Sequence, residues 1–168
     1  GIPGYGLMLR RAMAEKRPLA MLLPGFSNGL LPCGLSYAAF ARSLAAGGPI
    51  IHPAVTLANA ARIEGTGGDF LFYEEGVSDS TGRLIEALDR ERIAIGAKLG
   101  LSIVRDPQMG MRQGYMLEDN YGAAYRKAPG FLGIGAQPQL DHRYLNEDVG
   151  YGLVFMSLLA RQVGVATP

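Results

Sequence analysis

The sequence predicts a mainly α-helical fold over residues 49–168, preceded over residues 1–48 by a less regular segment that has room for short strands. Apolar residues recur at helical spacing over 80–99, and glycines follow both this run and the run that ends near Glu64. The first 48 residues are instead rich in glycine and proline. They predict strands and turns, or a short helix over 35–46.

The first helix of the helical region is expected to run from His52 to Glu64, and the GTGG sequence at 65–68 ends it. Proline is favoured in the first turn of a helix, because its missing N–H would have no partner there in any case. Pro53 therefore predicts that His52 lies at or near the N-cap of this helix.

The longest helix is expected from about Ser80 to Leu99, with Ser78, Asp79 or Ser80 as its N-cap and a glycine as its stop. Its apolar residues form one stripe, which predicts a side that packs on a core. The stripe consists of Leu84, Ile85, Leu88, Ile93, Ile95 and Leu99. The charged run DRER, 89–92, is expected on a solvent-exposed face with one or two ion pairs.

The remainder of the helical region is expected to alternate between loops and helices. The sequence DPQMG, 106–110, predicts a turn; 114–128 predicts one or two short helices; 131–140 predicts a loop. The last helix is expected to begin at Asn146, whose side chain can cap it, and to end at Gly164. Acidic residues follow in its first turn, where the helix dipole favours them.

Composition and charge exclude several classes of function. A formal net charge of +1, with scattered basic residues, offers no basic surface to nucleic acid. The single cysteine, Cys33, excludes an internal disulfide, and with two histidines and no HExxH spacing no metal site is expected. Two prolines interrupt the apolar stretch 19–41, which favours a buried segment over a membrane span. We therefore expect a cytoplasmic protein, with a membrane-associated protein as the weakest alternative.

His52 and Asn59 are the first candidates for chemistry. Seven residues span about two helical turns, so both side chains would project from nearly the same face, roughly 10 Å apart along the axis. A proton donor and an amide placed in this way suit one small substrate. A lone histidine beside apolar residues is more often a hydrogen-bonded structural residue, so that interpretation stays open as well.

Arg143 and Asp148 form the second candidate group, at the start of the last helix. The guanidinium of an arginine is a fork-shaped donor that suits the carboxylate of a substrate. An aspartate can pair with a histidine from another helix, raise its pKa and fix its tautomer. The alternative is a salt bridge between Arg143 and Asp148 that only caps the helix.

Three stretches together resemble the helical C-terminal domain of the opine (octopine/nopaline) dehydrogenases. They are IIHPAVTLANAARIE, DFLFYEEGVSDSTGRLIEALDRERIAIGAKLGL and LDHRYLNEDVGYGLVFMSLLARQVGVATP, in that order over residues 49–168. The resemblance implies an oxidoreductase that uses NAD or NADP to reduce the imine formed between an amino acid and a 2-oxo acid. It also implies that an N-terminal Rossmann domain holds the cofactor, while the helical domain supplies catalytic and substrate-binding groups.

The resemblance also implies roles for four residues. His52 matches the catalytic histidine, Asp148 its carboxylate partner, and Arg143 the arginine that holds a substrate carboxylate. Asn59 matches an asparagine on the helix of the histidine and is expected to help bind substrate. A histidine–aspartate pair can act as general acid and base near neutral pH. No cofactor-binding residue is assigned, because the start of a nucleotide-binding βαβ unit is absent from the sequence.

The resemblance makes residues 1–48 the tail of a nucleotide-binding domain and residues 49–168 the catalytic domain. The expected partners are the two substrates and either a separate nucleotide-binding domain or a second copy in a homodimer. The alternative from another class is a non-catalytic helical module for dimerisation or small-ligand binding that lacks the cofactor half. A strand followed by G-x-G-x-x-G upstream of Gly1 would favour the enzyme.

Overall fold

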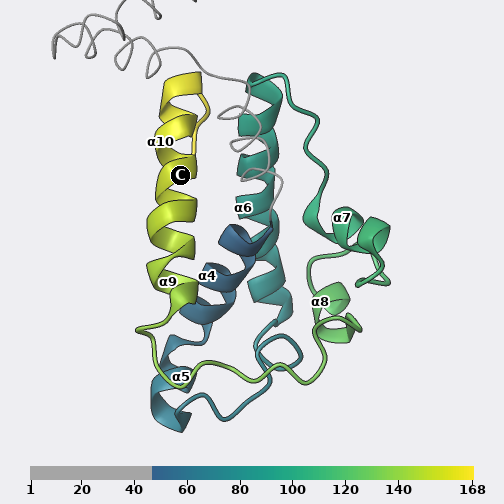
Figure 1. The fold of residues 1–168 in the computed structure, drawn as a ribbon, viewed down its shortest axis with the longest axis vertical. Coiled ribbons are helices and arrows are strands. Elements are labelled where there is room, and N and C mark those ends of the chain that lie inside the picture. Colours follow the sequence, from purple (N-terminus) through teal and green to yellow (C-terminus); the bar gives the residue numbers. More distant parts are fainter. Residues whose placement is uncertain (1–46) are drawn as a thin grey trace, which may run out of the picture. The chain divides into compact units, whose positions relative to one another are not determined.

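The computed structural model describes residues 47–168, and within them it shows helices and no β-strand (Figure 1). This confirms the predicted mainly α-helical fold for the described part of the chain. The helix predicted at 35–46, Cys33 and the apolar stretch 19–41 lie outside the described residues, and the domain boundary near residue 48 stays a prediction.

Three helices form the body of the fold: α4 (Gly48–Ala58), α6 (Asp79–Lys98) and α10 (Val154–Val163). Helices α6 and α10 stand side by side, and α4 packs against α6 beside the lower part of the pair (Figure 1). Between them lies a core of buried apolar side chains, in which each valine, isoleucine or methionine contributes about 1.5–3 kcal/mol when fully buried. Its aliphatic members are Ile50, Ile51, Ala54, Val55, Val77, Ile85, Ile95, Met156 and Ala160.

Helix α4 begins earlier than the sequence predicts. Pro49, not Pro53, occupies the first turn, and Gly47 is the N-cap. His52 therefore lies in the second turn of the helix, and the prediction that it lies at or near the N-cap was wrong. Pro53 stands inside the helix, where it leaves one backbone carbonyl without its usual donor. The physical reason is that GPII can already start a helix, and burial of the isoleucines favours the earlier start.

The predicted helix 52–64 is divided into two at Asn59. Helix α4 ends there, and α5 (Ala60–Thr66) begins. The side-chain amide of Asn59 donates hydrogen bonds to the carbonyl oxygens of Val55, at 2.8 Å, and Gly76, at 2.9 Å. Because these bonds offer the backbone an alternative to a continuous helix, they account for the break. The glycines at 65–68 end α5 as predicted, since Gly67 caps it at a φ of 62°.

Helix α6 confirms the longest predicted helix, and the hydroxyl of Ser78 caps it by accepting from the N–H of Thr81 at 3.1 Å. The charged run 89–92 contradicts the prediction of a solvent-exposed face, because the side chains of Asp89 and Arg92 are 0% and 1% exposed. The Asp89 carboxylate accepts from Arg92, the N–H of Asp106 and the Tyr121 hydroxyl. Four groups from three parts of the chain therefore meet in one buried network.

Two further elements differ from their predictions. The expected turn at 106–110 is the start of helix α7 (Asp106–Gln113), in which Pro107 suits the first turn and Gly114 ends the helix at a φ of 82°. One short helix, α8 (Ala123–Lys127), forms within 114–128, as predicted. A loop follows, and it meets residues 70–72 through an isolated antiparallel bridge between Leu71 and Gly135.

The last predicted helix consists of three elements: α9 (Arg143–Asn146), the π-helix η1 (Asp148–Leu153) and α10. His142, not Asn146, caps the start, because the His142 Nδ1 accepts from the N–H of Tyr144 at 3.4 Å. The predicted end at Gly164 is confirmed, with a φ of 71°. No helix in residues 47–168 has the length and apolar character needed to cross a membrane.

Candidate active site

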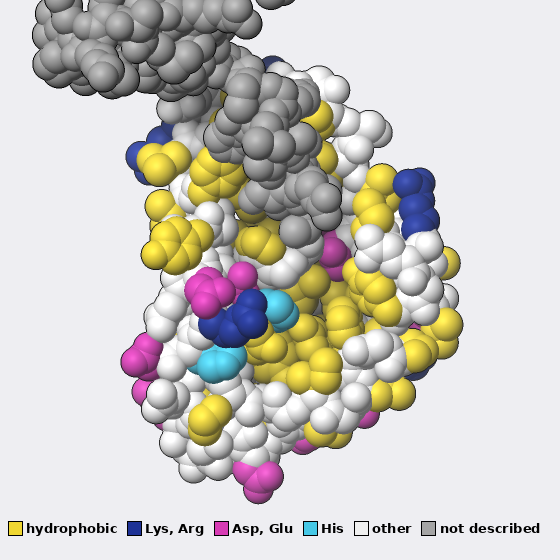
Figure 2. Space-filling view, in the orientation of Figure 1, with side chains coloured by type: hydrophobic (Ala, Val, Ile, Leu, Met, Phe, Trp, Pro, Cys, Tyr) yellow, Lys and Arg dark blue, Asp and Glu magenta, His cyan; other side chains and the backbone are white. Residues whose placement is uncertain are grey.

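His52 and Asp148 meet where α4 packs against η1. The Nδ1 of His52 lies 2.7 Å from the Oδ2 of Asp148, and the two side chains are 22% and 19% exposed. The residues are 96 positions apart in the sequence, so only the tertiary fold unites them. Figure 2 shows histidine, acidic and basic side chains gathered at the edge of a hollow whose floor is hydrophobic. The pair is thus largely buried but keeps some contact with solvent.

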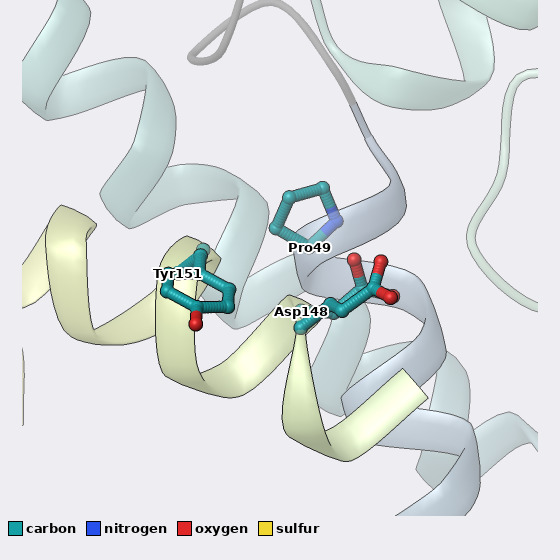
Figure 3. Close-up of a pocket in the computed structure, with 5 residues that line it drawn as sticks. Pro49, Asp148 and Tyr151 are labelled. Atoms are coloured by element: carbon teal, nitrogen blue, oxygen red, sulfur yellow. The ribbon is translucent and has the colours of Figure 1, made fainter. Parts of the chain in front are cut away.

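The close approach of the two elements depends on Gly152. A Cβ on this residue would lie 2.6 Å from the Cβ of Pro49, which is closer than side-chain carbons approach. The wide turn of η1 carries both Asp148 and Tyr151, and Figure 3 shows Pro49 of α4 facing that turn. Together with Glu147 and Gly152, these residues line a shallow open depression beside the histidine–aspartate pair.

The second ring nitrogen of His52 also has a partner. Its Nε2 lies 3.0 Å from the hydroxyl oxygen of Tyr73. The ring of Tyr144 stacks on the imidazole with centroids 4.0 Å apart and planes 17° apart. Phe72 contacts the same group, at 5.0 Å from the Tyr144 centroid. The imidazole is therefore held at both nitrogens and on one face.

Burial lowers the pKa of His52 below its ordinary value of 6.5, because an imidazolium is poorly solvated there. The hydrogen bond and the negative charge of Asp148 oppose this change, and the positive charges of Arg143 and His142 add to it. A histidine held in this balance is neutral over most of the neutral pH range. In that state it is equipped to accept a proton.

Arg143 lies at the start of α9, close enough for its charge to act on His52. Its side chain is 67% exposed, and its nearest acidic partner is Glu147, at 3.7 Å. A contact of that length holds the guanidinium only weakly, so its donors remain available to a ligand. The alternative of a salt bridge between Arg143 and Asp148 does not occur in the structure, since the Asp148 carboxylate bonds His52.

Asn59 lies at the junction of α4 and α5, with its amide nitrogen on the two backbone carbonyls described above. The structure thus brings His52, Asp148 and Arg143 into one region, and gives Asn59 a local role in ending a helix. Any contact of Asn59 with substrate would fall to its side-chain oxygen.

Sequence reasoning missed Tyr73 and Tyr144. Tyr73 lies in DFLFYEEGV, a stretch that the sequence predicts only as an aromatic connection. Tyr144 directly follows Arg143, and the only available signal was an aromatic ring within the second candidate group. Within residues 47–168, no group of three or more His, Cys, Asp or Glu side chains is arranged to hold a metal ion.

Comparison with known proteins identifies the family to which this chain belongs. Residues 38–168 match the model of the family described as NAD/NADP octopine/nopaline dehydrogenase, alpha-helical domain. The chain belongs to this family. An opine dehydrogenase of Arthrobacter sp. (strain 1C) is 38% identical over 126 residues, which cover 71% of this chain and 33% of the relative.

Two further relatives of the family are both named Protein ocs. The one from Agrobacterium vitis is 33% identical over 121 residues, covering 71% of this chain and 34% of the relative. The one from Agrobacterium tumefaciens (strain Ach5) is 32% identical over 121 residues, with the same coverage of 71% and 34%. The chain therefore spans about a third of the length of the curated relatives that it matches.

The family name includes NAD and NADP. The described residues alone do not form a binding site that would suit either dinucleotide. Such a site is built from a strand, a glycine-rich turn and the start of a helix. Residues 47–168 contain helices and one isolated bridge, so this unit does not occur among them. What the described residues of this octopine/nopaline dehydrogenase domain do contain is the hydrogen-bonded pair of His52 and Asp148, with Arg143 nearby.

Proposed function

We propose that this chain is the catalytic and substrate-binding helical domain of an opine dehydrogenase-like oxidoreductase. The reaction is the NAD(P)H-dependent reduction of the imine formed from an amino acid and a 2-oxo acid. The observation that carries the proposal is the 2.7 Å hydrogen bond between His52 and Asp148, beside an exposed arginine. Family membership supports the same assignment.

His52 is the proton-exchanging group of this proposal. With Asp148 accepting from Nδ1, the neutral ring carries its proton on Nδ1 and offers the lone pair of Nε2. Asp148 fixes that tautomer and stabilises the imidazolium when it forms. His52 thus takes a proton from the substrate nitrogen when the opine is oxidised, and returns a proton when the imine is reduced.

Arg143 is the proposed anchor for a substrate carboxylate. Both an amino acid and a 2-oxo acid carry a carboxylate, and a guanidinium binds one through two parallel hydrogen bonds. Asn59 is a weaker candidate, through its side-chain oxygen. We also propose that a nucleotide-binding domain holds the cofactor and that the enzyme is a homodimer, and both proposals rest on family membership. The proposal that the enzyme is cytoplasmic rests on the single cysteine.

The experiment that tests the proposal is NAD(P)H oxidation by the full-length protein with a panel of amino acids, each paired with pyruvate or another 2-oxo acid. We expect turnover with at least one pair. A His52→Gln variant should lower kcat by about 10²–10⁴-fold, which is the usual contribution of general acid–base catalysis. The absence of turnover with every pair would contradict the proposal that the protein is an enzyme and would favour a non-catalytic helical module. A fully active His52→Gln variant would contradict the proposed role of His52.

A further inference from the structure

The hydroxyl of Tyr73 lies at the nitrogen through which His52 would exchange protons. The Nδ1 of His52 donates to the Asp148 carboxylate, which only accepts, so the lone pair of the neutral ring is on Nε2. The Tyr73 hydroxyl is 3.0 Å from that atom, on a side chain 21 residues further along the chain. Neither Asp148 nor Arg143 reaches Nε2, so Tyr73 is the protein group best placed to control it.

Packing holds the Tyr73 ring firmly in this place. The residue is 4% exposed. Its ring stacks on Phe131, with centroids 4.2 Å apart and planes 14° apart, and meets Phe72 edge-on at 5.0 Å. Aromatic contacts of this kind are directional, so they restrict where the hydroxyl can lie. The hydroxyl is therefore fixed in the structure before a substrate arrives.

The Tyr73 hydroxyl also keeps the proton that it needs as a donor. Burial raises its pKa well above the ordinary value of 10, so it remains protonated throughout the neutral range. A phenol is both donor and acceptor. It can donate to Nε2 of the neutral imidazole, and after a rotation of the O–H it can accept from Nε2–H of the imidazolium.

We propose that Tyr73 is a positioning residue for His52: in the substrate-free site its hydroxyl donates to the single lone pair of Nε2 and sets the orientation of the ring. The hydroxyl gives up this hydrogen bond when the substrate nitrogen approaches Nε2 to exchange its proton. Asp148 at one nitrogen sets the tautomer, and Tyr73 at the other sets the ring orientation. A half-buried imidazole without Tyr73 would have an unpaired acceptor and would sample other orientations. The inference rests on the proposed function to the extent that His52 must be the proton-exchanging group.

Tyr73→Phe in the full-length protein tests the inference, because it removes only the hydroxyl and retains the stacking on Phe131. We label the protein with ¹⁵N-histidine and assign His52 by the loss of its signals in His52→Gln. The Nε2 resonance should move toward that of a nitrogen that accepts no hydrogen bond, while Nδ1 stays protonated. The kcat should fall about five- to tenfold, corresponding to one hydrogen bond, with KM values within about twofold of wild type.

Tyr121→Phe is the matched control, since Tyr121 is another buried tyrosine whose hydroxyl bonds a carboxylate, Asp89, and not His52. It should leave the His52 resonances and kcat unchanged, even where it lowers the melting temperature. Unchanged His52 resonances in Tyr73→Phe would overturn the inference, as would a wild-type kcat in an active enzyme. An enzyme without turnover would overturn the proposed function, and the resonances would still decide whether Tyr73 bonds Nε2.

Discussion

At His52, the lowered pKa couples ionisation to folding. Above about pH 6.5 neither the folded nor the unfolded chain carries a proton on this ring. As the pH falls below that value, the unfolded chain binds a proton first, because burial lowers the pKa of the folded state. The free energy of unfolding contributed by His52 therefore falls as the pH drops toward the pKa of the folded state, and is regained as the pH rises.

Urea unfolding from about pH 8 to about pH 5, on wild type and His52→Gln, measures this effect. The stability difference between the two proteins should change in favour of the variant as the pH falls below about 6.5. Several groups face the ring and set the size of the change: Asp148, Arg143, His142, Tyr73 and Tyr144. A difference that is constant with pH would contradict the lowered pKa.

Arg143 makes a prediction about substrate affinity. Arg143→Ala should raise the KM of a carboxylate substrate by about ten- to hundredfold, because a hydrogen bond to a charged group contributes about 1.5–3 kcal/mol. The kcat should change little if the contact is equally strong in the ground and transition states. Arg161→Ala, an exposed arginine on α10, is the control and should leave KM at the wild-type value. Equal KM values for the two variants would contradict the assignment.

The candidate site could be predicted in part from residue types. His52, Arg143 and Asp148 are found by a resemblance that covers three stretches in order, and two of them share a hydrogen bond in the structure. Tyr73 could not be found in this way, since nothing in DFLFYEEGV indicates which ring faces the histidine. That choice depends on Phe131, which stacks on Tyr73 from a loop 58 residues later.

At the level of elements, η1 allows α4 to approach closely through Gly152. Gly152→Ala places a methyl group 2.6 Å from Pro49 Cβ, so α4 and η1 must separate. We expect a loss of about 1–3 kcal/mol in stability from overpacking. We also expect kcat to fall by about tenfold or more, since a displacement near 1 Å in a site can cost about 10²-fold.

Gly150→Ala is the control for this prediction, as it adds the same methyl group in the same π-helix. A Cβ at Gly150 meets nothing within 4 Å, so stability and turnover should remain at wild-type values. Urea unfolding and steady-state assays on both variants measure the difference. Equal effects of the two changes would show that the contact with Pro49 is unimportant.

Helix boundaries could be predicted where one local signal dominated. Ser78 and the apolar stripe fix α6 because capping and burial favour the same register. DPQMG could start either a turn or a helix, and contacts of Asp106 with Asp89 and Tyr125 favour the helix. At the last helix, His142 caps a start at Arg143, and the side-chain amide of Asn146 instead donates to Asp141.

For the whole domain, the buried network around Asp89 is a strong constraint. Asp89→Asn removes the negative charge that faces the buried Arg92, and should cost about 3–5 kcal/mol in the free energy of unfolding. Glu86→Gln on the same helix is the control. It affects the outer pair with Arg90 and should cost less than about 0.5 kcal/mol. A similar small cost for both variants, measured by urea unfolding, would contradict the structural role of Asp89.

The burial of DRER could not be predicted from the sequence, because four charged residues in succession are usually solvated. Two of them are covered by α7 and by the ring of Tyr121, which supply the backbone N–H and the hydroxyl that satisfy Asp89. Arg90 is exposed and pairs with Glu86, as expected for a solvent-exposed face with ion pairs. Whether a charged residue of this run is buried or exposed therefore depends on which distant segments pack over it, and the local sequence does not indicate this.

The separation of 96 residues between His52 and Asp148 has a consequence for the growing polypeptide. A ribosome releases His52 long before Asp148, and until η1 emerges the histidine has no acidic partner. Closing so long a loop carries an entropic cost, which the packing of α6, α9 and η1 against α4 helps to offset. The proposed proton transfer by this pair therefore requires that synthesis has passed residue 148.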